Sequence, residues 1–224
     1  MPTPEIDIRH YNGQATATFH IGQLERTGRV DQVEPELWIV GNDPECFNDI
    51  RCIEQTAEKM AELLRPHEVD CLFAPATRSL MTAFRTAELL GHEQIAIARK
   101  DISPAPPEIV RVEMTSITSG RTGELMIDGE TRDILSGKEV ALFDDVISRG
   151  NTMNALKELA GRANAKVVAI ATVGIEGAAP YRVFQEEFRQ GSLIYLAVLP
   201  LFASGRTYDI LMEDKRLVEE IFRI

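Results

Sequence analysis

Residues 139–153, which read EVALFDDVISRGNTM, decide the fold class of this chain. Residues 140–143 are an apolar run typical of a buried strand, and Met153, Leu156 and Leu159 recur after it at helical spacing. The stretch therefore predicts a strand, a short loop and a helix. In such a unit the loop amides and the helix N-terminus converge beyond the carboxyl end of the strand, at a point that attracts an anion.

The loop carries side chains that suit a phosphate. Ser148 and Thr152 add hydroxyl donors, and Arg149 adds positive charge. Gly150 lets the backbone approach a ligand closely because it has no side chain. We therefore expect a phosphate site in this loop.

Two adjacent carboxylates, Asp144 and Asp145, precede the loop. As acceptors, they suit the diol of a ribose or a magnesium-bound water better than a phosphate. A plainer interpretation is that they merely end the strand and that Asn151 or Thr152 caps the helix. That interpretation does not explain two carboxylates beside an anion-binding loop, one of which must approach the low-dielectric end of the strand.

Strand and helix patterns alternate from about residue 49 to residue 199, which indicates a parallel α/β sheet. A first helix follows the possible caps Asn48 and Asp49 and ends before Pro66, and a second ends at Gly91. Further strands are expected at residues 71–74, 95–98, 167–173 and 193–199. Before the last strand, a helix is expected with its apolar face formed by Val183, Phe184 and Phe188.

The chain divides into three segments. Residues 1–48 contain possible strands at 15–21 and 37–40 without a crossover helix, and we expect them to form a small β-rich cap or hood. Residues 49–200 form the α/β core. Residues 201–224, with a helix at 214–222, pack on the core or on the hood.

Two further segments suit a diphosphate. Residues 74–79, reading APATRS, follow a strand and precede a helix, so their amides and Arg78 can receive an anion. Arg99 and Lys100 close the strand at 95–98, and their plainer interpretation is an exposed pair of cations. Between these segments and the acidic pair, residues 112–127 alternate polar and apolar side chains around a Ser-Gly-Arg-Thr-Gly turn, which predicts a long β-hairpin with a mobile tip.

Residues 139–153 resemble the motif with which type I phosphoribosyltransferases bind 5-phosphoribosyl 1-diphosphate (PRPP). In that family the acidic pair holds the ribose hydroxyls and the following loop holds the 5′-phosphate. Two positions depart from the commonest form of the motif: Arg149 replaces a Thr, and Asn151 replaces a frequent Gly. In having a basic residue at the first of these positions, the motif resembles that of the purine operon repressors, which share the fold.

The other segments resemble the same family. APATRS is similar to the pyrophosphate loop of adenine phosphoribosyltransferases, and Arg99 with Lys100 matches a pair that points at PRPP. The hairpin lies where type I enzymes carry a catalytic flexible loop, which implies that Arg121 reaches the diphosphate together with Ser119 and Thr122. Adenine enzymes have a Glu where this chain has Ser119, so the hairpin looks closer to the repressor and xanthine phosphoribosyltransferase branch.

The resemblance implies an α/β fold of the type I phosphoribosyltransferase kind, with helices flanking a parallel sheet. It implies transfer of the phosphoribosyl group from PRPP to a purine or related nucleobase, release of pyrophosphate, a need for Mg²⁺ and a homodimer. Asp144, Asp145 and Arg121 are the catalytic candidates, and the two Asp residues hold the metal indirectly, through water or PRPP. The candidates for PRPP binding are Thr77, Arg78, Arg99, Lys100, Asp144, Asp145, Ser148, Arg149, Gly150, Asn151 and Thr152.

The base pocket is less defined. Ile147, the second residue after the acidic pair, is the candidate for base binding. Phe202 or Tyr208 can stack on a planar ring. Two other functions stay open. One is a non-catalytic PRPP-binding regulator that resembles the purine operon repressors but lacks their DNA-binding module, and the other is an unrelated protein that binds phosphate or magnesium.

The composition of the chain limits the classes of partner that we expect it to bind. The formal net charge of −11 over 224 residues, with no basic run, argues against a nucleic-acid-binding surface. Cys46, Cys52 and Cys71 lie outside any metal-ligand spacing and indicate reduced thiols in a cytoplasmic protein. The chain shows no apolar run of membrane-spanning length and no signal segment, so neither a membrane nor a nucleic acid is an expected partner.

Overall fold

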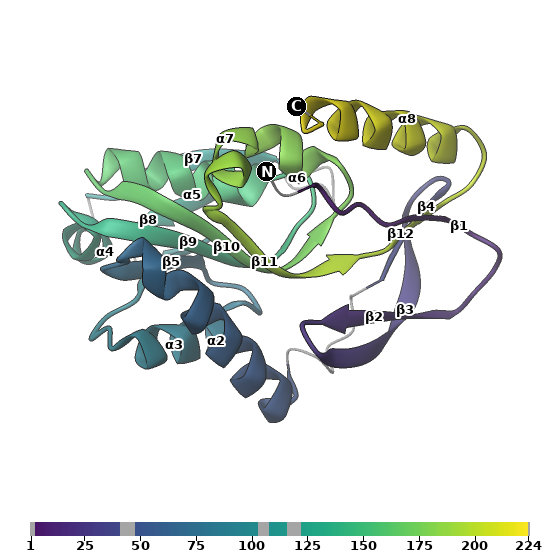
Figure 1. Cartoon of the computed structure of the whole chain (residues 1–224). Coiled ribbons are helices and arrows are strands. Elements are labelled where there is room, and N and C mark those ends of the chain that lie inside the picture. The colour runs from purple at the N-terminus through teal and green to yellow at the C-terminus, as the bar shows by residue number, and fades with distance from the viewer. Residues whose placement is uncertain (1–2, 41–47, 103–107, 116–121, 224) are drawn as a thin grey trace.

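A parallel five-stranded sheet forms the core of the computed structural model, which describes residues 3–40, 48–102, 108–115 and 122–223 (Figure 1). Its strands run in the order β11-β10-β9-β5-β6, with every neighbouring pair parallel. Their bounds are β5 (Cys71–Pro75), β6 (Ala96–Ala98), β9 (Glu139–Ile147), β10 (Lys166–Glu176) and β11 (Leu193–Leu199). The parallel α/β sheet expected from the sequence is confirmed.

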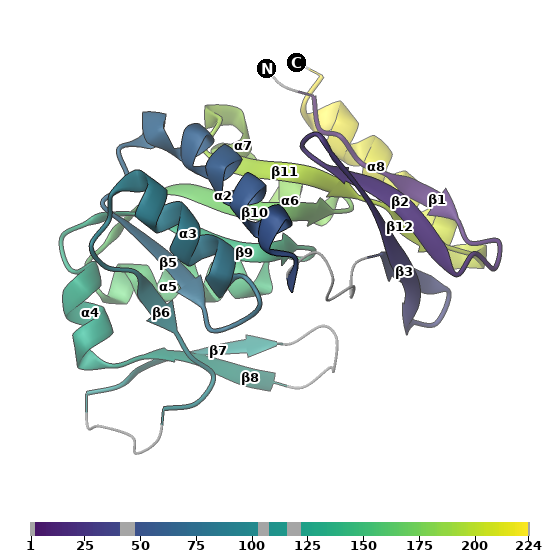
Figure 2. The same ribbon diagram turned by 90° about the horizontal axis from the view of Figure 1, so that it is seen from below.

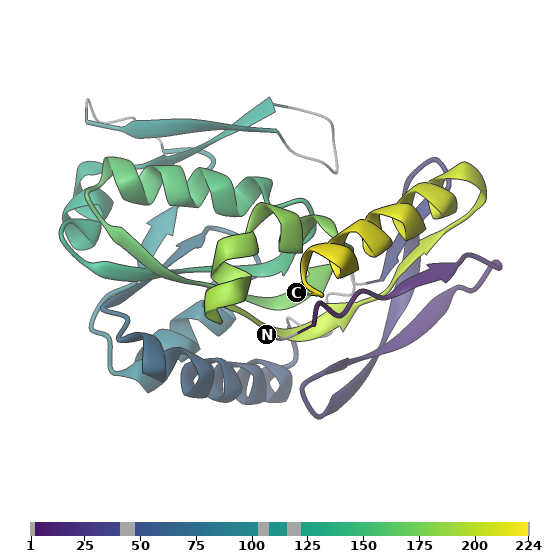
Figure 3. The ribbon, with the colours of Figure 1, turned by 45° about the horizontal axis from the view of Figure 1, so that its top comes forward.

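Helices cover both faces of this sheet. On one face lie α2 (Ile50–Leu64) and α3 (Leu80–Leu90), and on the other lies α5 (Asn151–Arg162), as Figure 3 shows. Asp49 caps α2 by accepting hydrogen bonds from the amides of Arg51 and Cys52, and α2 passes into a 3₁₀ turn, Arg65–His67, at Pro66. A short helix, α4 (Gly129–Leu135), follows the hairpin.

The helix expected around Phe184 is two short helices instead, α6 (Ala179–Val183) and α7 (Gln185–Gln190). Phe184 lies between them with φ −114° and ψ 43°, outside the helical region. Phe184 and Phe188 are buried in the core, but the side chain of Val183 is 42% exposed. The expectation of one helix with a shared apolar face was therefore wrong, because the chain bends at Phe184 to bury its ring.

The predicted hairpin is present. Strands β7 (Val110–Thr115) and β8 (Thr122–Ile127) pair antiparallel, and β7 packs against α5. Figure 2 shows the hairpin alongside the core sheet, and Arg99 joins it there by two backbone hydrogen bonds of 2.8 and 2.9 Å with Met126. The tip, which includes Ser119 and Arg121, lies outside the described residues.

A second five-stranded sheet, which we call the hood, combines the two ends of the chain in the order β1-β12-β4-β3-β2. Four of its strands come from the N-terminal segment: β1 (Ile8–His10), β2 (Thr16–Ile21), β3 (Leu24–Glu34) and β4 (Leu37–Val40). The strand β12 (Leu201–Ala203) enters between β1 and β4 and is parallel to the first and antiparallel to the second. The helix α8 (Gly205–Ile221) follows it and lies against this sheet (Figure 1).

Two features of the hood differ from the sequence expectations. The helix α8 begins at Gly205 rather than at residue 214, and only Val218 is buried on it, so the sequence carries a weak apolar stripe there. The eleven-residue strand β3 was not expected at all. Its side chains alternate between partly and fully exposed positions over most of its length, so it lacks the apolar run of a core strand.

No helix in the described part of the chain has the length and apolar character needed to cross a membrane.

Candidate functional site

A cavity of about 490 Å³ lies at the carboxyl ends of β9 and β10, between the core sheet and the hood. The core side of its lining includes Asp145, Ser148 and Glu176, and the hood side includes Glu34 and Leu37. In parallel α/β sheets, ligands bind beyond the carboxyl ends of the strands. The cavity is therefore the candidate functional site.

The acidic pair lies at the core side of this cavity. Strand β9 extends to Ile147, so Asp144 and Asp145 lie within the strand rather than after it, and Asp144 pairs with Thr172 of β10. Asp144 is only 5% exposed and accepts hydrogen bonds from the amide of Asp145 at 2.9 Å and the hydroxyl of Thr77 at 3.4 Å. Burial, and then repulsion from Asp145, raise the pKa of Asp144 well above its ordinary value.

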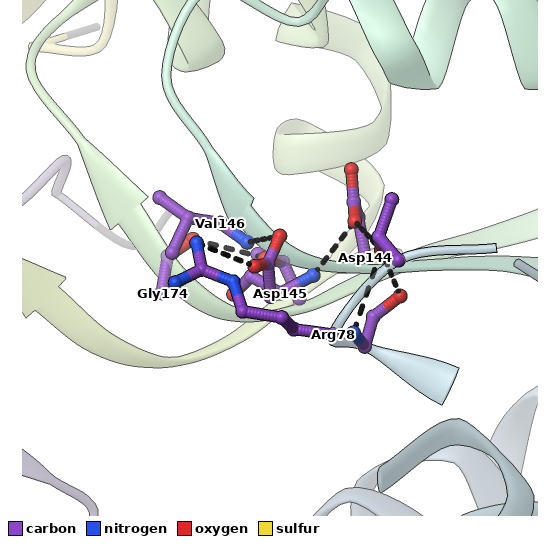
Figure 4. Close-up of polar contacts among 8 residues, drawn as sticks. Arg78, Asp144, Asp145, Val146 and Gly174 are labelled. Carbon is purple, nitrogen blue, oxygen red and sulfur yellow. Dashed lines mark hydrogen bonds and ion pairs between the residues drawn. The ribbon is translucent and has the colours of Figure 1, made fainter. Parts of the chain in front are cut away.

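The predicted diphosphate loop meets this acidic pair. The guanidinium of Arg78 lies 3.3 Å from a carboxylate oxygen of Asp145, and Figure 4 shows its side chain extended alongside that carboxylate. Asp145 also accepts a hydrogen bond of 2.9 Å from the amide of Val146, which fixes its orientation. Thr77 and Arg78, which were expected to receive the diphosphate, thus contact the acidic pair. The fold brings them together although 67 positions of sequence separate Thr77 from Asp144.

The predicted phosphate loop leads directly into α5. Gly150 is the N-cap residue with φ +83°, and no side chain caps the helix. The alternative in which Asn151 or Thr152 caps the helix is therefore wrong. The first amides of α5 lack intrahelical partners, and Ser148, Asn151 and Thr152 border the same cavity, so this end of the helix presents donors to an anion.

Gly150 also permits close packing. A Cβ atom at this position would meet the ring of Phe184 at 3.0 and 3.1 Å, closer than ordinary van der Waals contact. The bend at Phe184 and the left-handed glycine thus fit together, and they hold the loop against the junction of α6 and α7.

Sequence reasoning missed Glu176, the last residue of β10. Glu176 is 6% exposed and lines the cavity together with Ser148. Burial raises the pKa of its carboxyl group to about 7, and the side chain of Ser148 opposes that rise. The available sequence signal was its place directly after the largely apolar run at residues 167–175; the structure adds that this strand lies beside the one that carries the acidic pair.

The remaining predicted site residues differ in whether their side chains reach the cavity. Lys100 lines the cavity, whereas Arg99 does not border it and is held by backbone hydrogen bonds with Met126. Ile147 borders the cavity with only 2% of its surface exposed, whereas the neighbouring Val146 is half-buried and also borders it. Arg149 borders the cavity, but its guanidinium pairs with Glu34 of the hood at 2.7 Å.

The two aromatic candidates for base stacking belong to the hood instead. Phe202 is 3% exposed, and the guanidinium of Arg9 lies over its ring, 5.8 Å from the centroid. Tyr208 stacks on His10 with 3.5 Å between the ring centroids. Neither ring borders the cavity. Its apolar wall on the hood side is formed by aliphatic side chains, which are Val33, Leu37, Ile39, Leu201 and Leu211.

The fold and the site define an α/β protein in which paired carboxylates and a helix N-terminus border one cavity. The phosphoribosyl transferase domain matches residues 47–185, more than half of the chain, and the chain belongs to that family. The resemblance drawn from residues 139–153 is confirmed.

Curated relatives carry two activities in their names. An adenine phosphoribosyltransferase of Petrotoga mobilis is 28% identical over 128 residues, which are 57% of this chain and 67% of the relative. A xanthine phosphoribosyltransferase of Leuconostoc mesenteroides is 26% identical over 143 residues, which are 63% of this chain and 66% of the relative. The aligned part is thus about two thirds of each relative.

Solved structures share the fold. The adenine phosphoribosyltransferase of Thermoanaerobacter pseudethanolicus aligns with a TM-score of 0.58 at 20% identity, covering 76% of this chain and 94% of that one. The enzyme of Giardia lamblia, complexed with 9-deazaadenine, aligns with a TM-score of 0.57 at 14% identity, covering 85% and 94%. The expected type I phosphoribosyltransferase fold is confirmed.

The turn at Gly150 yields a first prediction. Gly150→Ala forces a side chain into the left-handed region and against Phe184, so we expect a loss of roughly 1–3 kcal/mol in the free energy of unfolding. Gly161→Ala, in the same helix and with nothing within 4 Å of its Cβ, is the matched control and should stabilise by up to about 1 kcal/mol. Urea unfolding measures both, and equal effects of the two changes would contradict this account of the turn.

The carboxyl group of Glu176 yields a prediction about pH. Its folded pKa of about 7 lies above the ordinary 4.5, so between these values the folded protein holds a proton that the unfolded chain has lost. The free energy of unfolding should therefore fall as pH rises through this window. Glu176→Gln removes the loss, and we expect the variant to be more stable by roughly 3 kcal/mol above pH 7 and little changed near pH 4.5.

Unfolding midpoints between pH 4.5 and 8.5 measure this difference. Glu220→Gln, at an exposed position of α8, is the control and should follow the unmodified protein at every pH. A stability difference for Glu176→Gln that does not change with pH would show that folding does not raise the pKa of Glu176.

Proposed function

We propose that the protein is an enzyme that transfers the 5-phosphoribosyl group from PRPP to a purine or related nucleobase and releases pyrophosphate. The observation that carries the proposal is the convergence of three expected elements on one cavity. The acidic pair of β9, Arg78 of the preceding loop and the N-terminus of α5 all border it. Family membership supports the same chemistry.

Each element has a distinct role in binding PRPP. The amides at the start of α5, with the hydroxyls of Ser148 and Thr152, receive the 5′-phosphate. Asp144 and Asp145 accept hydrogen bonds from the ribose hydroxyls and stabilise positive charge that develops at C1′. Arg78, which contacts Asp145, and Lys100 border the same cavity and neutralise the diphosphate, which makes it a better leaving group.

Arg78 must change partner when PRPP binds. In the free protein its guanidinium pairs with Asp145, and the diphosphate competes for the same donor. The pair keeps both groups in place before the substrate arrives, so less side-chain freedom is lost on binding.

The proposal includes Mg²⁺. The donor set fits a hard cation, because two adjacent carboxylates supply oxygen ligands and their mutual repulsion falls beside a positive charge. No group of three or more His, Cys, Asp or Glu side chains suited to a metal occurs within the described residues. Asp144 and Asp145 would therefore hold the ion through water or PRPP oxygens, where it neutralises charge on the diphosphate.

The hood supports a purine-sized acceptor. Its aliphatic wall can lie against a flat ring, and polar groups border the same cavity. The relatives named for adenine and for xanthine support the purine class. The alternative is a PRPP-binding regulator that lacks a DNA-binding module, and the hood strands at residues 8–40 are compatible with it too, so turnover and not the fold distinguishes the two functions.

We propose a cytoplasmic homodimer. The free cysteines Cys52 and Cys71 are buried, which suits a reducing compartment. On α3, Met81 and Phe84 are 55% and 62% exposed and lie on the same face of the helix at a spacing of three residues. Large exposed apolar side chains are typical of a surface that a partner covers.

The acidic pair provides the main test. Asp144→Asn with Asp145→Asn keeps the shapes of the side chains but removes both charges, and we expect PRPP affinity to fall about tenfold or more. Folding should persist, because the change relieves repulsion within the pair. Calorimetry with PRPP and Mg²⁺ measures the affinity. Asp209→Asn with Glu213→Gln, two exposed positions of α8, removes the same charge and is the control; equal affinities in both variants would refute the site.

Arg121 provides a kinetic test, since it is the catalytic candidate beyond the described residues. If the hairpin acts on the transition state, Arg121→Gln should lower kcat about a hundredfold and change PRPP affinity much less. Arg216→Gln on α8 is the matched control. An unchanged kcat would remove the hairpin tip from the mechanism.

The dimer has a direct test. Phe84→Glu places a charge in the proposed interface and should convert dimers to monomers in sedimentation equilibrium. Leu217→Glu, at a position of α8 that is 49% exposed, should leave the association unchanged. A dimer that survives the first change, or dissociates equally with the second, would place the interface elsewhere.

A further inference from the structure

The strand β3 reaches from the core sheet to the phosphate loop and is held near both ends. In the turn just before it, the amide of Gly22 donates a hydrogen bond of 3.0 Å to the carbonyl of Leu196 in β11, and near the start of β3 Arg26 pairs with Asp49, the cap of α2, at 3.2 Å. At its far end, Glu34 pairs with Arg149 at 2.7 Å. The last contact joins the hood to the loop that is expected to hold the phosphate.

The position of Arg149 makes this contact informative. Arg149 stands between Ser148 and Gly150 in the loop, where a cation was expected to serve the phosphate. Its guanidinium instead reaches Glu34, a residue 115 positions away in sequence. Both residues border the cavity, so the contact lies at the wall of the site and not on a remote surface.

The far end of β3 carries part of the apolar wall. Val33 precedes Glu34 and borders the cavity, and Glu34 pairs across the hairpin with Leu37 of β4, which borders it too. Any displacement of Glu34 therefore moves side chains that would lie against the base. The contact between Arg149 and Glu34 links the position of this wall to the loop that anchors the sugar phosphate.

We propose that Arg149 and Glu34 form a latch that holds the β3–β4 hairpin on the phosphate loop and thereby positions the apolar wall against the nucleobase. The inference rests on the proposed function for its ligand. Both members are positioning residues, because they act on the base through the hairpin. Each is about half exposed, with side-chain exposures of 47% and 41%, so the latch contributes modestly to folding and mainly to the geometry of the site.

The latch makes a prediction that a phosphate-binding role of Arg149 does not. Arg149→Gln and Glu34→Gln each open the latch, so each should raise KM for the base by about threefold to fivefold. The double variant should be no worse than either single change, because the same contact is lost. If Arg149 serves only the phosphate, Glu34→Gln releases its guanidinium and leaves KM for the base unchanged.

A matched ion pair on the same strand provides the control. Arg29 and Asp31 also lie 2.7 Å apart, but neither borders the cavity. Arg29→Gln and Asp31→Asn should leave KM for the base unchanged. Steady-state kinetics with adenine and xanthine as acceptors at saturating PRPP measures these effects. Additive effects of the two latch changes, or an unchanged KM in Glu34→Gln, would overturn the proposal.

A second readout needs no turnover. Opening the latch should speed amide hydrogen exchange in the hairpin, at Gln32–Glu34 and in β4, in both latch variants and in neither control. If the unmodified protein turns over no base, the proposed function fails, and exchange still decides whether the latch exists. Equal exchange in Arg149→Gln and in Arg29→Gln would show that it does not.

Discussion

The turn from β9 into α5 is the constraint on which the rest of the site depends. Gly150 adopts φ +83° and leaves no room for a side chain beside Phe184. The turn therefore places the first amides of α5 directly beyond the strand that carries Asp144 and Asp145. An anion-binding helix end and a pair of carboxylates thus share one cavity, although they attract opposite charges. A ligand with an anionic group at one end and hydroxyl groups near it suits both the helix end and the carboxylates.

The acidic side of the cavity is held under electrostatic strain. Asp144 and Glu176 are buried carboxyl groups with raised pKa values, and Asp145 contributes to both shifts. Arg78 offsets part of this repulsion by its contact with Asp145. A protein optimised for stability alone would replace such groups, so their presence indicates a functional demand on the site. Cationic charge that develops on a bound sugar during transfer would relieve the same repulsion.

The core and the strand, loop and helix of residues 139–153 could be predicted from sequence because both depend on local patterns. Buried parallel strands are apolar runs, and the motif of residues 139–153 is contiguous. Glu176 was missed because its place at the end of an apolar run does not show which strand lies beside it, and its role arises from the pairing of β10 with β9. The hood was predicted only in part. Its strand β12 joins strands from the other end of the chain, and β3 is largely solvated, so neither shows a local pattern of a buried strand. The partner of Arg149 could not be predicted, since Glu34 lies 115 residues away.

The central claim is that this cavity transfers the phosphoribosyl group to a base. Pyrophosphate release from PRPP and Mg²⁺, measured across adenine, hypoxanthine, guanine, xanthine, uracil and orotate with PRPP binding followed by calorimetry in parallel, tests it most directly. The account predicts PRPP binding and release that requires a purine. Binding without release for any base would contradict turnover and favour a regulator, and the absence of both would contradict the phosphoribosyl site itself.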